Sequence, residues 1–251
     1  MVLYFVGLGL WDEKDISLKG LEIVRKCDKI FLDGYTSKLG VGVEKLEKLF
    51  GKKVEVANRE LVESKAELIL ESAIKQQVAF LVVGDVFSAT THMDLYVRAK
   101  KLGVGVKVIN NASVFSAVGV TGLQLYKFGK TTSIAANVES ETAYNVIKDN
   151  SKIGLHTLVL LDLDVEKGKY MSVNEAITRL LKLEAKLKAK VFTAETKCVG
   201  CARFGSDDCV IKYGKAEELL KQDFGGPLHC LIVPGKLHFI EEEVLGFWEL
   251  V

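Results

Sequence analysis

Short apolar runs alternate with amphipathic segments from one end of the chain to the other. Apolar runs of strand length, each followed by a segment with helical spacing, are typical of an α/β fold with largely parallel sheets. In the first half of the chain, this pattern predicts strands at residues 3–6, 29–32, 54–56, 79–83 and 106–109.

Helical patterns lie between these predicted strands. Leu18, Leu21 and Val24 follow one another at a spacing of three residues, which places them on one helix face. Ser64 and Glu67 have the spacing of a capping box, so we expect them to open a helix that runs to residue 75. A further helix is predicted at residues 93–101, with a glycine ending it.

The second half has a more mixed pattern. A second capping box, formed by Ser172 and Glu175, predicts the start of a long helix. We expect helices at residues 114–126, 172–188 and 239–248, and strands at 132–135, 158–163, 191–193, 198–203, 210–213 and 228–233. The predicted fold class is α/β with two domains, a mostly parallel N-terminal domain at 1–112 and a mixed-sheet C-terminal domain at 113–251.

Charge and hydropathy argue against nucleic-acid binding, membrane association and secretion. The 34 basic and 33 acidic residues leave a formal charge of +1, which argues against a broad basic face for nucleic acid or anionic lipid. No apolar run approaches the length of about 18 residues that crosses a bilayer. The apolar start lacks a basic leader and predicts a buried strand rather than a secretory signal. We therefore expect a cytoplasmic protein.

Cys198 and Cys201 have the Cys-x-x-Cys spacing of many zinc sites. The segment around them has a strand pattern, and residues three apart in a strand point to opposite faces. Buried thiols are therefore the favoured interpretation, although Gly200 leaves a tight turn possible. We expect no metal.

Glycine-rich turns follow several predicted strands, where open α/β sheets bind their ligands. Gly7 and Gly9 resemble the start of a dinucleotide fingerprint, but Asp12 occupies the place of its third glycine. Acidic residues around that position disfavour a pyrophosphate and suit a positively charged ligand instead.

Asp85 follows the strand at 79–83 and precedes a run of hydroxyl side chains. Two interpretations stay open. In the first, Asp85 holds a hydroxyl or amine of a ligand, and the hydroxyl side chains cap the next helix. In the second, Asp85 and the hydroxyl side chains are helix caps only. His229 fits a core histidine better than a catalyst. The lysine-rich stretch at 182–190 is interpreted as a solvated helix face.

The turns, taken in order, resemble the diphthine synthases, a branch of the tetrapyrrole methylase superfamily. The resemblance rests on motifs spread over essentially the whole chain: Phe5-Val-Gly-Leu-Gly-Leu10, Gly84-Asp85 through Ala89-Thr-Thr-His92, Asn111 through Gly122, Gly154 through Asp162, Ala202-Arg-Phe-Gly-Ser206 and Pro227 through His238.

This resemblance implies a homodimer of two α/β domains with S-adenosylmethionine bound in the cleft between them. It implies methyl transfer to the amino group of a 3-amino-3-carboxypropyl chain on a histidine of translation elongation factor 2, with S-adenosylhomocysteine as the second product. The cofactor contacts that it implies are Leu10, Asp85, Ser88, Ser113, Val114, Leu161, Phe204 and His229. The chain departs from the family at Val86, where proline is common, and at Phe204, where the residue is often small.

No catalytic side chain is predicted, because methyl transfer from a sulfonium relies on positioning and desolvation. One alternative is a relative that methylates a tetrapyrrole carbon, although Leu10-Trp11 stands where those relatives often have Gly-Pro-Gly. A second alternative, of another class, is a nucleotide-binding module without catalysis.

Overall fold

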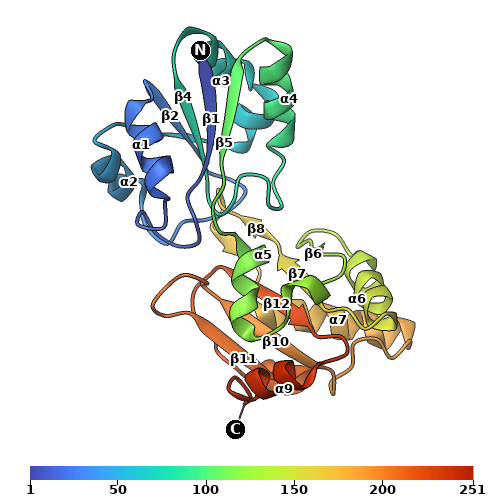
Figure 1. Cartoon of the computed structure of the whole chain (residues 1–251). Coiled ribbons are helices and arrows are strands. Elements are labelled where there is room, and N and C mark those ends of the chain that lie inside the picture. The colour runs from blue at the N-terminus through green and yellow to red at the C-terminus, as the bar shows by residue number, and fades with distance from the viewer. Residues whose placement is uncertain (251) are drawn as a thin grey trace. The chain divides into compact units, whose positions relative to one another are not determined.

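The computed structural model describes residues 1–250, which form two compact α/β units. The first unit comprises residues 1–115 together with 165–167, and the second comprises the remaining described residues. Figure 1 shows each unit built on its own sheet. The domain division at residue 112 stays a prediction.

The first unit is a parallel sheet covered by helices. Its strand order is β3-β2-β4-β1-β5, and each pairing is parallel. Phe5 and Phe80 lie fully buried on the two central strands and pack edge to face. The elements are β1 (Val2–Gly7), α1 (Leu18–Lys26), β2 (Lys29–Asp33), α2 (Val43–Phe50), β3 (Glu55–Ala57), the π-helical turn η1 (Glu60–Ser64), α3 (Glu67–Lys75), β4 (Val78–Val82), α4 (Met93–Lys101) and β5 (Gly105–Ile109).

The sequence patterns locate the five strands of this unit to within about two residues, and α4 is confirmed as predicted. The expected capping box at Ser64 is wrong. Residues up to Ser64 already form the turn η1, so the helix begins later, with Ala66 as an N-cap that makes no side-chain bond.

The second unit contains a mixed sheet. Its order is β11-β10-β12-β7-β6, in which β7 pairs in parallel with β6 and antiparallel with β12. The helix α5 (Val114–Ala117) spans the boundary between the two units at residue 115. The elements that follow are the 3₁₀ turns η2 (Val118–Thr121) and η3 (Leu125–Lys127), β6 (Thr132–Ile134), α6 (Thr142–Lys152), β7 (Thr157–Leu161), β8 (Leu163–Asp164), β9 (Lys169–Tyr170), α7 (Val173–Leu187), β10 (Lys197–Ala202), β11 (Val210–Lys215), α8 (Ala216–Leu219), β12 (His229–Val233) and α9 (Phe239–Gly246).

Two predictions in this unit are wrong, and the other predicted helices and strands are confirmed to within about two residues. The expected helix at 114–126 is broken into short turns, with Gly122 at a φ of 92° between them. The segment 191–193 is not a strand, because the Val191 and Phe192 amides bond the Glu184 carboxylate and the Thr193 amide bonds the Thr196 hydroxyl. The capping box of Ser172 and Glu175 opens α7 as predicted.

A buried ionic cluster fastens α9 to this sheet. The Glu241 carboxylate is fully buried, and it accepts hydrogen bonds from Lys127 Nζ and from His156 Nε2, the latter at 3.0 Å. It also accepts the backbone amides of Gln124 and His238. The Gly235 amide donates to His156 Nδ1, which fixes the imidazole as a donor toward Glu241.

Within residues 1–250, no helix is long and apolar enough to cross a bilayer.

Candidate functional site

In the first unit, two glycine-rich turns meet at the carboxyl ends of β1 and β4. Gly9 and Gly84 bond each other through both backbone amides, at 3.2 and 2.7 Å. Both glycines have positive φ, of 89° and 82°, a conformation that side chains disfavour. The turn that carries Leu10 and the turn that carries Asp85 are therefore held side by side.

Asp85 connects this pair of turns to the end of β5. Its Oδ2 accepts the side-chain amide of Asn110 and the backbone amide of Asn111, both at 3.0 Å. Its Oδ1 lies 3.4 Å from the Phe87 amide and from the Ser88 hydroxyl. Asp85 thus orders the loop on which Ser88 lies, and it does not cap α4.

Asn111 completes the link between the three strand ends. Its Nδ2 donates to the carbonyls of Gly7 and Asp15, each at 3.0 Å. A side chain at Gly7 would lie 2.7 Å from the Gly84 carbonyl, so only glycine fits there. Ser113 is buried one residue before Val114, the first residue of α5, and Gly84 packs against it.

The hydroxyls after Asp85 do not cap α4, contrary to expectation. Thr90 Oγ1 donates to the Val86 carbonyl at 2.7 Å, and Thr91 Oγ1 bonds the Tyr35 hydroxyl at 2.9 Å. The N-cap of α4 is His92, which makes no capping bond. Its buried Nε2 bonds Asp33 at the end of β2, so His92 anchors the far end of the Asp85 loop.

The acidic turn after Leu10 has one unsatisfied oxygen. Asp15 Oδ2 accepts the Trp11 and Asp12 amides, and Asp12 Oδ1 accepts the Lys14 amide. Glu13 Oε2 is buried without a hydrogen-bond partner. A buried carboxylate oxygen is costly to leave unpaired, so this turn fits a ligand with a positive charge or a donor.

In the second unit, three predicted residues reach one end of the sheet. Leu161 ends β7, His229 begins β12, and the register pairs Leu160 with Cys230 and Ala202 with His229. Phe204 follows β10 at the same end. The pairing therefore gathers Leu161, Phe204 and His229 at one sheet edge.

His229 is held as a neutral imidazole. Its Nδ1 accepts the Val173 amide at 3.3 Å, and its Nε2 donates to the Gly226 carbonyl at 2.9 Å. Burial lowers the pKa of His229, which keeps the ring uncharged. Neither ring nitrogen is free to take up a further proton. This agrees with the sequence-based interpretation of His229 as a histidine whose hydrogen bonds are made within the protein.

Arg203 was not singled out from the sequence, although it lies inside the motif Ala202-Arg-Phe-Gly-Ser206. It is buried, with a φ of 53°. Its Nη1 donates to the carbonyls of Phe224 and Gly226, at 2.7 and 2.6 Å. Its Nε and Nη2 bond Asp208. Arg203 therefore joins the loop before His229 to the turn that carries Phe204.

The cysteines are free thiols in the described part of the chain. Cys198 and Cys201 lie in β10, so the predicted extended segment is confirmed. Burial raises the pKa of both thiols far above the ordinary value. Residues 1–250 contain no group of three or more potential ligands placed to hold a metal ion.

Comparison with known proteins gives matches over most of the chain. The family model for tetrapyrrole (corrin/porphyrin) methylases matches residues 2–220. The chain is 48% identical to a probable diphthine methyl ester synthase of Arabidopsis thaliana, over 99% of this chain and 98% of that protein. It is 47% identical to a diphthine synthase of Methanococcus maripaludis, over 98% of each chain.

The fold is similar to that of solved structures as well. A crystal structure described as a putative diphthine synthase from Entamoeba histolytica superposes with a TM-score of 0.92 and 44% identity, over 100% of this chain and 99% of that chain. A second crystal structure, of a diphthine synthase, gives a TM-score of 0.92 at 41% identity, over 99% of this chain and 96% of the other.

Proposed function

The chain belongs to the tetrapyrrole (corrin/porphyrin) methylase family, and we propose that its protein substrate is translation elongation factor 2. It is an S-adenosylmethionine-dependent methyltransferase with the activity of a diphthine (methyl ester) synthase in diphthamide biosynthesis. The observation that carries this function is 47–48% identity over nearly the whole chain to proteins of that activity. The acceptor that we propose is the amino group of a 3-amino-3-carboxypropyl chain on a histidine of the factor.

The residues present fit the cofactor. S-adenosylmethionine supplies a methyl group on a positively charged sulfonium. The unpartnered oxygen of Glu13, in the turn that carries Leu10, suits such a charge. We propose that Leu10, Asp85, Ser88, Ser113 and Val114 of the first unit, and Leu161, Phe204 and His229 of the second, contribute cofactor contacts.

The chain's own residues position the cofactor and the acceptor and exclude water from them, and no side chain of the protein forms a covalent intermediate. The interlocked glycine turns present backbone groups at fixed places, and such preorganisation carries much of the barrier reduction in a displacement reaction. The acceptor amine must be neutral to attack, and a site of low polarity lowers its pKa. Since His229 is bonded at both ring nitrogens, water or another nearby side chain takes the departing proton.

Mass spectrometry of the substrate tests this function. The protein is incubated with S-adenosylmethionine and with elongation factor 2 that bears the aminocarboxypropyl histidine, and the modified peptide is weighed. We expect methyl groups on nitrogen, which survive mild alkali. A methyl lost in mild alkali would be an ester and would assign the activity named for the Arabidopsis relative. No mass gain would refute the proposed substrate.

Replacing Asp85 by asparagine tests the first half of the cofactor site. An amide would turn one acceptor oxygen of Asp85 into a donor that faces other donors, so the loop with Ser88 loosens. We expect the dissociation constant for S-adenosylmethionine to rise about tenfold, since bonds to a charged group contribute most. Calorimetric titration measures it, with Asp94→Asn on the exposed side of α4 as a control. Unchanged affinity would leave Asp85 as a structural cap only.

We propose a homodimer and a cytoplasmic location. Apolar side chains stand exposed where η2 and η3 pack against α9, with Tyr126 at 80% and Phe247 at 77% exposure. The Gln124 amide bonds Glu241 at 3.0 Å, which ties the segment before η3 to α9. Burial against a second copy would remove this surface from water.

Light scattering after size exclusion tests the dimer. We expect a dimer for the wild-type chain and a monomer for Tyr126→Glu combined with Phe247→Glu, because two buried charges would have no partner. Glu71→Lys on the exposed side of α3, in the first unit, serves as the control. A wild-type monomer at micromolar concentration would contradict the proposal.

A further inference from the structure

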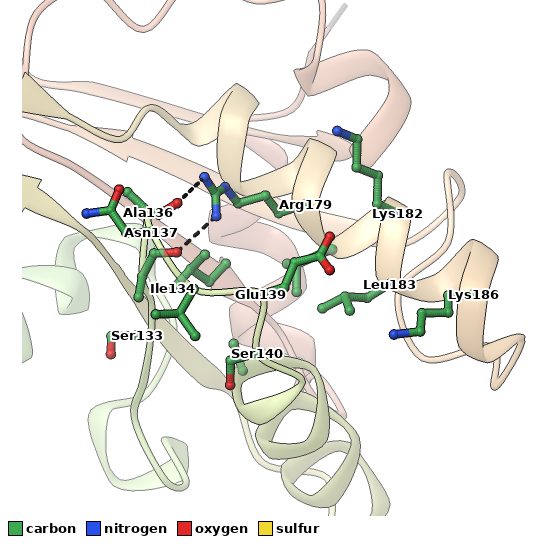
Figure 2. A pocket seen from close by; sticks show the side chains of 14 residues that line it. Ser133, Ile134, Ala136, Asn137, Glu139, Ser140, Arg179, Lys182, Leu183 and Lys186 are labelled. Carbon is green, nitrogen blue, oxygen red and sulfur yellow. Dashed lines mark hydrogen bonds between the residues drawn. The ribbon is translucent and has the colours of Figure 1, made fainter.

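A groove in the second unit lies outside the predicted cofactor contacts. It runs between α7 and the loop that joins β6 to α6, and its volume is about 370 Å³. Figure 2 shows the basic side chains along α7 and Glu139 on the facing loop. Ile134, Ala143, Leu180 and Leu183 form apolar parts of its lining. The first three of these are buried.

The charged lining is mainly positive. Arg179, Lys182 and Lys186 line the groove from consecutive turns of α7, and Glu139 is the acidic residue that lines it. Arg179 donates from Nη1 to the Ala135 carbonyl and from Nη2 to the Ala136 carbonyl, at 2.9 and 2.8 Å. Both acceptors are neutral, so the guanidinium is fixed in place with its charge uncompensated.

The lysine ammonium groups are available as well. Lys182 and Lys186 are exposed, and no ion pair involves them in the described part of the chain. The sequence alone favoured a solvated helix face for this stretch. The structure adds a concave apolar surface beneath these charges and a guanidinium anchored to the opposite wall, which a plain solvated face lacks.

The groove adjoins the strand end that carries a predicted cofactor contact. In the parallel pair of β6 and β7, Ile134 lies opposite Leu161. The next residue, Asp162, donates its amide to the Ile134 carbonyl and accepts the Ala136 amide on Oδ2, at 3.2 and 2.6 Å. The wall of the groove is thus tied directly to the segment that follows Leu161. A chain whose modified residue reaches the cofactor must pass over surface next to that segment.

We propose that this groove binds an acidic segment of the protein substrate that flanks the residue to be methylated. This inference rests on the proposed function, because the substrate is elongation factor 2 carrying the aminocarboxypropyl histidine. Carboxylates of the segment pair with the guanidinium and the two ammonium groups, and its apolar side chains cover the floor. Bidentate pairing with a fixed guanidinium selects carboxylate geometry. Glu139 competes with the segment, since it offers a carboxylate to the same cations.

Steady-state kinetics with opposite charge changes test the proposal. With S-adenosylmethionine saturating, we expect Lys182→Glu combined with Lys186→Glu to raise KM for the modified factor about tenfold, with kcat and cofactor affinity unchanged. We expect Glu139→Gln to lower KM. The KM of the wild-type chain should rise with salt more steeply than that of the double variant. A matched control, Lys148→Glu with Lys221→Glu, makes the same net charge change at exposed sites away from the groove.

The possible outcomes distinguish failure of the groove proposal from failure of the proposed function. Methyl transfer by the wild-type chain with the same KM in the groove variant and the control would overturn the groove and leave the function standing. A direct titration of the factor without turnover gives a second readout, and equal affinities for all variants would also overturn it. Neither transfer nor binding by the wild-type chain would overturn both. A groove variant that loses affinity for an RNA oligonucleotide but not for the factor would reassign the charges and refute the acidic segment.

Discussion

The Arg203→Ala variant is expected to lose about 3–5 kcal/mol of unfolding free energy, the usual effect of breaking a buried charged network. The buried guanidinium donates to the carbonyls of Phe224 and Gly226 and to Asp208. Alanine removes the Arg203 donor from the Phe224 carbonyl and leaves the Gly226 carbonyl with His229 Nε2 as its donor. Water cannot replace all the lost bonds in a buried position. Chemical denaturation monitored by tryptophan fluorescence measures the loss.

The Arg203→Ala variant should also bind S-adenosylmethionine more weakly than the wild-type chain. The loss of affinity should exceed what the smaller folded fraction alone would cause. Arg203 fixes the carbonyl of Gly226, which in turn receives the Nε2 proton of His229. Asp208→Ala is the control, because the Asp208 side chain is 68% exposed and exposed ion pairs contribute less than about 1 kcal/mol. Equal, small losses in both variants would contradict the central role of the guanidinium.

The Glu241→Ala variant is expected to be destabilised by a similar 3–5 kcal/mol. Its fully buried carboxylate is the shared acceptor for Lys127, His156 and two backbone amides. Removal takes the acceptor from His156 Nε2 and from the two backbone amides, and it loosens α9 from the segment before β7. Lys127 keeps its bond to the Lys236 carbonyl. Denaturant unfolding at neutral pH measures the effect, with Glu242→Ala on the exposed side of α9 as the control. A loss no larger than that of Glu242→Ala would show that the cluster is dispensable.

Acidification should act on the same cluster. Burial opposes ionisation of Glu241, but the bonds from Lys127, Gln124, His238 and His156 outweigh it and lower the pKa to about 2 from 4.5. Burial lowers the pKa of His156 from 6.5. Both groups bind protons more readily in the unfolded chain, so stability falls as pH falls below 6.5 and falls further between 4.5 and about 2. Between pH 4.5 and about 2 the pH dependence should be shallower in Glu241→Ala, because the carboxylate that titrates there is gone.

Much of the fold follows from periodicity. Buried strands such as β4 consist of continuous apolar residues, which is typical of a parallel strand covered on both faces. The wrong strand at 191–193 has a different cause. Glu184 takes the amides of Val191 and Phe192, in the loop directly after the helix that carries it. The apolar pattern of that loop does not show that a side-chain carboxylate takes its amides.

The sequence predicted only part of the site, because the rest depends on which strands become neighbours in the fold. The turns with Gly7, Gly9 and Gly84 follow strands, and strand ends of one parallel sheet must lie together. The role of Asp85 as a link to Asn110 and Asn111 depends on which strands are neighbours, and the order β4-β1-β5 is a tertiary property. Arg203 was missed because an arginine after a strand is ordinarily exposed, and only the fold buries it.

The bonding of His229 has a consequence for how the reaction responds to pH. One ring nitrogen accepts a hydrogen bond from the Val173 amide and the other donates to the Gly226 carbonyl. The imidazole therefore cannot serve as a proton relay at physiological pH. The rising limb of the rate profile would then be a property of the acceptor's own ammonium group. Chemical changes to the substrate amine should move that limb, whereas replacing His229 should leave its midpoint in place.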